Sequence, residues 1–129
     1  MRRFLRGQRG VETLEAAVTL PLMVLILLTI VEFGWAVYAQ QVAQEAARHG
    51  VRMGVVSQGN AAGAAMSAAS SYASNGALQG AQVSVLAPGG VVGTSLRVRV
   101  RYEVPHFLGF LGLPPLVVTG EAEGRQEGW

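Results

Sequence analysis

Residues 10–32 of the chain read GVETLEAAVTLPLMVLILLTIVE, and this stretch decides the fold. A glycine and, five residues later, a glutamate stand directly before residues 16–31, none of which is charged. A helix that crosses a membrane needs about 20 predominantly apolar residues. Counted on to Tyr38, the stretch is long enough to span a bilayer. Trp35 and Tyr38 suit the outer membrane interface, where aromatic rings with one polar end prefer to lie.

Arginines in the first ten residues predict the orientation of this helix. Four of the ten basic residues of the chain lie there. Because short flanks rich in arginine stay in the cytoplasm, residues 1–10 are predicted to be a cytoplasmic leader, and the chain beyond about residue 38 is predicted to lie outside the membrane. Without the leader, six arginines stand against eight glutamates, a formal net charge of −2. The basic character that would favour nucleic-acid binding is then gone.

The helix is predicted to continue beyond the membrane, over residues 11–57. Within the span, Pro21 removes a backbone hydrogen bond and is predicted to kink the helix. Beyond the span, small residues recur at spacings of three and four and form a stripe along one face. Such a stripe permits close approach, either of the chain's own sheet or of a helix from a partner. Its members are Ala39, Ala43, Ala46, Ala47, Gly50 and Gly54.

The remainder, residues 58–129, is predicted to be a small extracytoplasmic α+β domain. A Gln-Gly-Asn sequence breaks the long helix, and an alanine-rich and serine-rich segment predicts a second short helix that ends at Asn75 and Gly76. Alternating and turn-flanked segments predict about three strands in a small antiparallel sheet. These strands cover residues 82–86, 96–104 and 116–125.

The last two predicted strands carry opposite charges on one face. Residues 96–104 alternate between apolar and charged side chains, so one face is predicted to be core and the other wet. If the strands are neighbours, Arg99 or Arg101 faces Glu121 or Glu123, and such cross-strand pairs stabilise a ladder. A solvated strand face is the favoured interpretation of the arginines, with an anionic partner as the alternative.

Between these strands lies the apolar loop, residues 105–115, with the sequence PHFLGFLGLPP. A small domain has few large apolar residues with which to fill its centre, so the loop is predicted to tuck into the core. The alternative is that Phe107 and Phe110 face lipid or a neighbouring subunit.

The glycine and glutamate in front of the apolar run resemble the prepilin signal, which a membrane peptidase cuts after the glycine. The resemblance implies a cut after Gly10, Val11 as the new amino terminus and Glu15 as the retained acid. In a filament, Glu15 would pair with the new amino group of an adjacent subunit and thereby set the register.

The resemblance extends along the helix to the TadE-like minor pilins of the tight-adherence (Flp) pilus machinery. It implies a pilin-like fold and a structural role in pilus assembly. The implied location is the inner membrane, in a single pass. The implied partners are a prepilin peptidase, sister minor pilins, the major pilin and the assembly platform, and no cofactor is implied. The matching segments are LPL at 20–22, EFG at 32–34, YAQQ at 38–41 and AARHGVR at 46–52; the departures are Ala16, Trp35 and His49.

Three charged residues on the helix are candidate subunit contacts. Glu32 lies near the predicted outer end of the span, where hydration at the lipid headgroups is the favoured interpretation and contact with a partner subunit is the alternative. Arg48 and Arg52 lie one turn apart on the same face, and Glu45 stands three residues before Arg48. A solvated face with modest ion pairing is the favoured interpretation of both arginines, and the family resemblance adds subunit contacts as the alternative.

Catalysis is not expected from this inventory of side chains. The chain has no cysteine and no aspartate, and its two histidines are far apart in sequence, without the spacing of known metal or nucleophile motifs. No catalytic, metal or cofactor site is therefore predicted. Two other functions stay open: a soluble secreted domain released by signal peptidase after Ala39, and an uncleaved single-span membrane scaffold.

Overall fold

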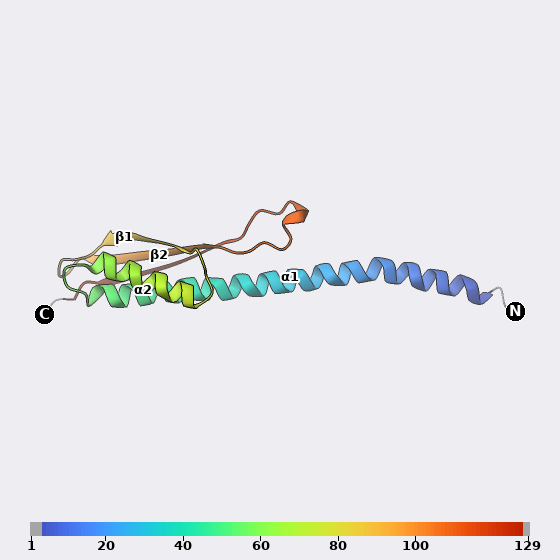
Figure 1. Cartoon of the computed structure of the whole chain (residues 1–129), viewed down its shortest axis with the longest axis horizontal. Coiled ribbons are helices and arrows are strands. Elements are labelled where there is room, and N and C mark those ends of the chain that lie inside the picture. The colour runs from blue at the N-terminus through green and yellow to red at the C-terminus, as the bar shows by residue number, and fades with distance from the viewer. Residues whose placement is uncertain (1–3, 128–129) are drawn as a thin grey trace.

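The computed structural model describes residues 4–127, so the first three residues of the predicted leader lie outside the described residues. The described part forms two α-helices, three strands and one 3₁₀ turn, in an α+β fold as predicted (Figure 1). The elements are α1 (Phe4–Val55), α2 (Ala61–Asn75), β1 (Gln82–Pro88), β2 (Ser95–Glu103), η1 (Gly109–Leu111) and β3 (Val117–Arg125).

Helix α1 runs along the whole length of the molecule. Its carboxyl-terminal half lies against α2 and the sheet, and its amino-terminal half projects away from them (Figure 1). Pro21 lies inside α1 without interrupting it, and the helix curves gently along its length. Membrane helices tolerate such a proline because neighbouring groups compensate for the lost hydrogen bond.

The sheet is antiparallel with the order β1-β2-β3. Along the central strand β2, every second residue is buried, which confirms the predicted core and wet faces. The register slips by one residue between Val85 and Ala87 of β1, which leaves a bulge at Leu86. The inward residues Leu96, Val98 and Val100 are fully buried and supply large side chains of the core, together with Leu78 and Val104 from outside the strands.

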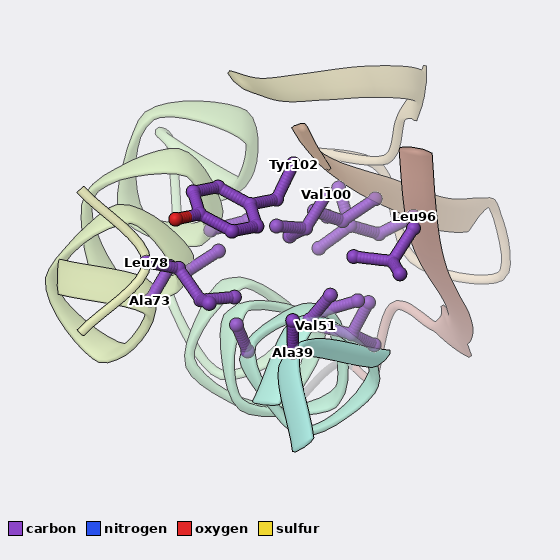
Figure 2. Packing of buried hydrophobic residues seen from close by; sticks show 14 of the residues in the cluster. Ala39, Val51, Ala73, Leu78, Leu96, Val100 and Tyr102 are labelled. Carbon is purple, nitrogen blue, oxygen red and sulfur yellow. The ribbon is translucent and has the colours of Figure 1, made fainter. Parts of the chain in front are cut away.

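The stripe of small residues on α1 packs within its own domain. Its alanines are fully buried, and they face buried alanines that recur every four residues along α2, namely Ala61, Ala65, Ala69 and Ala73. Figure 2 shows α1, α2 and the sheet meeting around this core. A methyl group on Gly50 would lie 2.7 Å from the carbonyl oxygen of Ala65, so the two helices touch backbone to backbone.

Strand β3 approaches α1 equally closely. A Cβ at Gly120 would lie 2.4 Å from the backbone of Ala43. On either side, glutamine side chains of α1 bond to the exposed edge of β3: Gln40 Nε2 donates to the Thr119 carbonyl oxygen at 2.9 Å, and Gln44 Nε2 donates to that of Glu121 at 2.6 Å. The helix thus satisfies part of an edge that would otherwise be open to another strand.

Opposite charges line the outer face of β2 and β3. Arg99 lies opposite Glu121 and forms the predicted ion pair with it. The second pair joins Arg97 to Glu123 at 2.6 Å, whereas Arg101 lies opposite Thr119. Hydrogen bonding to Arg97 holds the pKa of the Glu123 carboxyl below its ordinary value. Since all four side chains are nearly half exposed, these pairs make modest contributions.

The apolar loop does not tuck into the core, and that prediction is wrong. Leu108 is buried, but Phe107 and Phe110 are 54% and 70% exposed. Buried alanines and valines already complete the core, so the loop's aromatic rings find no space there. A hydrogen bond from the Val104 amide to the Leu116 carbonyl oxygen, 2.8 Å long, closes the base of the loop.

The Gly120→Ala substitution tests the contact between α1 and β3. We expect a loss of about 1–3 kcal/mol in the free energy of unfolding, because the added methyl group overlaps backbone that cannot rotate away. Gly34→Ala is the matched control, since nothing lies within 4 Å of its added Cβ. Thermal unfolding in detergent micelles measures both. Equal stability of the two variants would refute the close contact.

A double-mutant cycle with Arg99→Ala and Glu121→Ala tests the ion pair on the sheet. We expect a coupling free energy of about 0.2–1 kcal/mol, as for opposite charges across a ladder. The coupling should shrink at high salt because both side chains are solvated. Denaturant unfolding of the four proteins measures it. A cycle on Arg101 and Glu121 is the control, and equal coupling in both cycles would contradict the observed register.

Candidate functional site

The predicted processing residues lie on the amino-terminal half of α1, which projects away from the domain and is called the free half below. Val11 is 65% exposed, and Gly10 and Glu15 are exposed as well. Nothing lies within 4 Å of a Cβ built on Gly10. The peptide bond after Gly10 is therefore not shielded by any part of the chain that the structure describes. Glu15 has exposed apolar neighbours, Leu14 and Val18, and sits at the start of the uncharged run.

The uncharged run itself is uncovered. Helix α1 is long and apolar enough to cross a membrane, and its most apolar window has none of its residues buried by the described chain. In water, an exposed apolar surface of this length is a liability, whereas in a bilayer it is the stable arrangement. The free half of α1 is thus suited to lipid or to the apolar helices of neighbouring subunits.

At the carboxyl-terminal end of this run, α1 meets the apolar loop through a buried polar contact. Glu32 and His106 are 74 positions apart in sequence, and their side chains are only 7% and 15% exposed. A hydrogen bond joins His106 Nδ1 to Glu32 Oε1. On the other side of the ring, His106 Nε2 donates to the Leu113 carbonyl oxygen at 2.9 Å. The histidine therefore bridges the helix and the far arm of the loop.

The two hydrogen bonds together favour a protonated imidazole. With Nε2 donating to a carbonyl oxygen, Nδ1 can donate to the Glu32 carboxylate only when both ring nitrogens carry a proton. Consistent with this, the hydrogen bond to Glu32 raises the pKa of His106 above its ordinary value, and the bond to Leu113 raises it further against the opposing effect of burial. The contact then joins a cation to an anion in a largely apolar setting.

A hollow of about 300 Å³ lies beside this contact, between α1 and the loop. Apart from the Glu32 and His106 side chains and the Thr29 hydroxyl, its lining is apolar. The second carboxylate oxygen of Glu32 is buried and has no hydrogen-bond partner among the described residues. Most buried polar atoms have a partner, so this oxygen is an exception. The lining residues are Thr29, Glu32, Phe33, His106, Leu108, Leu113, Pro114 and Leu116.

The two roles predicted for Glu32 were a subunit contact and hydration at the lipid headgroups. The residue is buried and pairs with a histidine of its own chain, so it is not hydrated, and the subunit contact stays a prediction. His106 was not predicted as a site residue. The available signal was a single ionisable group within an otherwise apolar loop, but the sequence alone did not identify its partner 74 residues away.

Arg48 and Arg52 are both exposed, on the part of α1 that lies in the domain. Arg48 Nη1 lies 2.7 Å from Glu45 Oε1, so the modest ion pairing on this face is present as predicted. Their role as subunit contacts stays a prediction. These two arginines, Glu32 and the processing residues lie at three separate places along α1.

Replacing Glu32 by glutamine tests the charge of the contact. We expect the His106 pKa, which lies above 6.5 in the native protein, to fall in Glu32→Gln, because an amide cannot stabilise the imidazolium in the same way. The stabilisation of the docked loop is therefore complete below pH 6.5 and is lost as the pH rises through the raised pKa.

Imidazole NMR signals followed from pH 5 to 9 in micelles measure this effect. His49 lies against the Tyr72 ring on another part of the molecule and is an internal reference, because the substitution should not shift its NMR signals. An unchanged His106 titration in Glu32→Gln would contradict the pairing.

Comparison with known proteins agrees with the resemblance seen in the helix. The model of the family described as TadE-like protein matches residues 10–52. This segment begins at the proposed cleavage glycine and ends inside the domain, within the last turn of α1. No curated protein and no solved structure gave a match to the chain. The chain thus carries a TadE-like segment over residues 10–52, consistent with a TadE-like protein of the Tad pilus system.

Proposed function

We propose that the chain is a minor pilin or pseudopilin-like structural component for the assembly of a tight-adherence (Flp-type) pilus. A prepilin peptidase processes it after Gly10, and α1 holds it in the inner membrane in a single pass, with the amino terminus in the cytoplasm and residues 58–129 outside. The observation that carries the proposal is the TadE-like match over a helix whose amino-terminal half is apolar and uncovered.

The apolar surface of α1 supports a protein that moves from a bilayer into a bundle of helices. Its free half offers apolar side chains all round, as a helix does that is surrounded by lipid or by other apolar helices. In such surroundings an unpaired carboxylate is costly. We therefore assign to Glu15 the role of pairing with the amino group of Val11 on an adjacent subunit, which neutralises both charges.

The proposed role is structural and not enzymatic. Sister minor pilins, the major pilin and the assembly platform are the proposed partners, and Arg48 and Arg52 are candidates for contacts with them because they are exposed beside the domain. The paired arginines and glutamates of the sheet offer no surplus of positive charge, and nucleic acid is not a proposed ligand.

The position of Ala39 argues against the secreted-domain alternative. Ala39 is fully buried in the middle of α1 and belongs to the core. A cut after it would also remove Glu32 and Tyr38, whose side chains bond to His106 and to the Gly76 carbonyl oxygen. The released domain would lose contacts that hold its loop and the end of α2.

Intact mass of the protein from its native membrane tests the proposal. We expect a chain that begins at Val11. We expect Gly10→Val to abolish this cut, because valine then stands where the peptidase needs a glycine, directly before the cut. Gly34→Val is the matched control: both glycines are on the free surface of α1, with nothing within 4 Å of the new Cβ.

Glu15→Ala separates processing from assembly. We expect a chain that is still cut after Gly10 but fails to reach the pilus fraction. A native chain that begins at Gln40 would identify a secreted domain, and one that keeps Met1 would identify an uncleaved scaffold. Either result would refute the pilin assignment.

A further inference from the structure

We propose that the apolar loop, residues 105–115, inserts into the outer leaflet of the membrane beside α1, so that the chain contacts the bilayer at two places. The occupant of this surface is lipid. The inference rests on the membrane span of the proposed function and adds to it a second membrane contact, made by the folded domain.

The side chains of the loop have the composition of a lipid contact. Phe107, Phe110, Leu111 and Leu113 are each at least half exposed. From residue 104 to residue 120 the chain carries no arginine and no glutamate. The one ionisable side chain of this segment, His106, is hydrogen-bonded to Glu32. An apolar cluster of this kind is costly in water and gains free energy in hydrocarbon.

The loop also lies at the right depth. It projects from the sheet toward the free half of α1 (Figure 1), and it shares the lining of the hollow with Thr29 and Phe33. At about 1.5 Å of rise per residue, these two positions lie about 21 and about 27 Å beyond Glu15 along the helix. The hydrocarbon core is about 30 Å thick. With Glu15 at the inner face, the loop therefore reaches the outer part of the hydrocarbon.

The backbone of the loop tip is partly prepared for an apolar environment. Non-helical backbone at membrane depth is costly unless its polar groups are satisfied. The Leu111 amide donates to the Leu108 carbonyl oxygen, and the Gly112 amide donates to that of Gly109, both at 3.0 Å. Gly112 has a φ of +74°, which lets the chain turn back directly after η1. Phe110, the most exposed aromatic residue of the loop, lies within this compact turn.

The Glu32–His106 contact explains how a carboxylate is accommodated at this depth. Intramembrane acids are found paired, because an isolated charge there is expensive. His106 supplies the partner and at the same time attaches the loop to α1. The apolar hollow beside the pair opens between helix and loop, and its lining suits an acyl chain. Helix and loop thus form one continuous apolar surface, which favours lipid over an isolated protein partner.

The absence of cysteine from the chain allows a clean labelling experiment. Single-cysteine variants carry a bimane fluorophore in vesicles of phosphatidylethanolamine and phosphatidylglycerol, with bromine atoms placed either near the headgroups or deep in the acyl chains. Phe110→Cys, and independently Phe107→Cys, report on the loop. Leu27→Cys reports on the span. Val92→Cys, in the exposed turn between β1 and β2, is the control outside the membrane.

We expect shallow bromines to quench the loop labels more than deep bromines do, the reverse order at Leu27, and no quenching at Val92. Quenching at Leu27 with none at Phe110 and Phe107 would overturn the loop insertion and leave the span intact. No quenching at any position would overturn the span and the insertion together. A third outcome is that the loop labels are shielded from water only at a high protein-to-lipid ratio and are not quenched by bromine. This result would identify a second copy of the chain as the occupant and overturn the proposal.

Discussion

The close approach of α1 to α2 and to β3 is the constraint on which the rest of this structure depends. Where Gly120 lies against the backbone of Ala43, and Gly50 against that of Ala65, no side chain larger than a hydrogen atom fits. Helices and sheet can therefore come together around alanines, and the sheet and Leu78 supply larger core residues. A core of this kind buries limited apolar area, so hydrogen bonds such as those of Gln40 and Gln44 gain relative importance.

Local patterns in the sequence were sufficient to predict the elements and their faces. The alternation along β2 follows directly from the pleat of a strand, and the three-and-four spacing of small residues follows from the helical period. The packing partner of that stripe was predicted only as two alternatives, because small residues permit close approach without selecting the partner. The pairing of Arg99 with Glu121 could be predicted for a similar reason, since neighbouring strands leave few registers, although Arg97 and not Arg101 takes the second glutamate.

The contact between α1 and the apolar loop was beyond the reach of the sequence. Nothing near Glu32 indicates a histidine 74 positions later, because the contact depends on how the β2–β3 connection is directed along α1. The apolar loop was misjudged on a general argument about filling the centre of a small domain, whereas alanines at close range already fill it. Under the proposed arrangement, the exposed aromatic rings of the loop are in contact with lipid and need no protein core.

One uninterrupted helix from Phe4 to Val55 means that no flexible linker separates the uncovered apolar half of α1 from the domain. A force that draws the domain away from the membrane is transmitted along the axis of α1. The strands and α2 run alongside that axis (Figure 1), so the load acts in shear across their shared interface. In shear the contacts of Gly50 and Gly120 resist together, whereas a peeling load would break them one after the other. Under the proposed function, these close backbone contacts would resist a pull by the growing filament along the axis of α1.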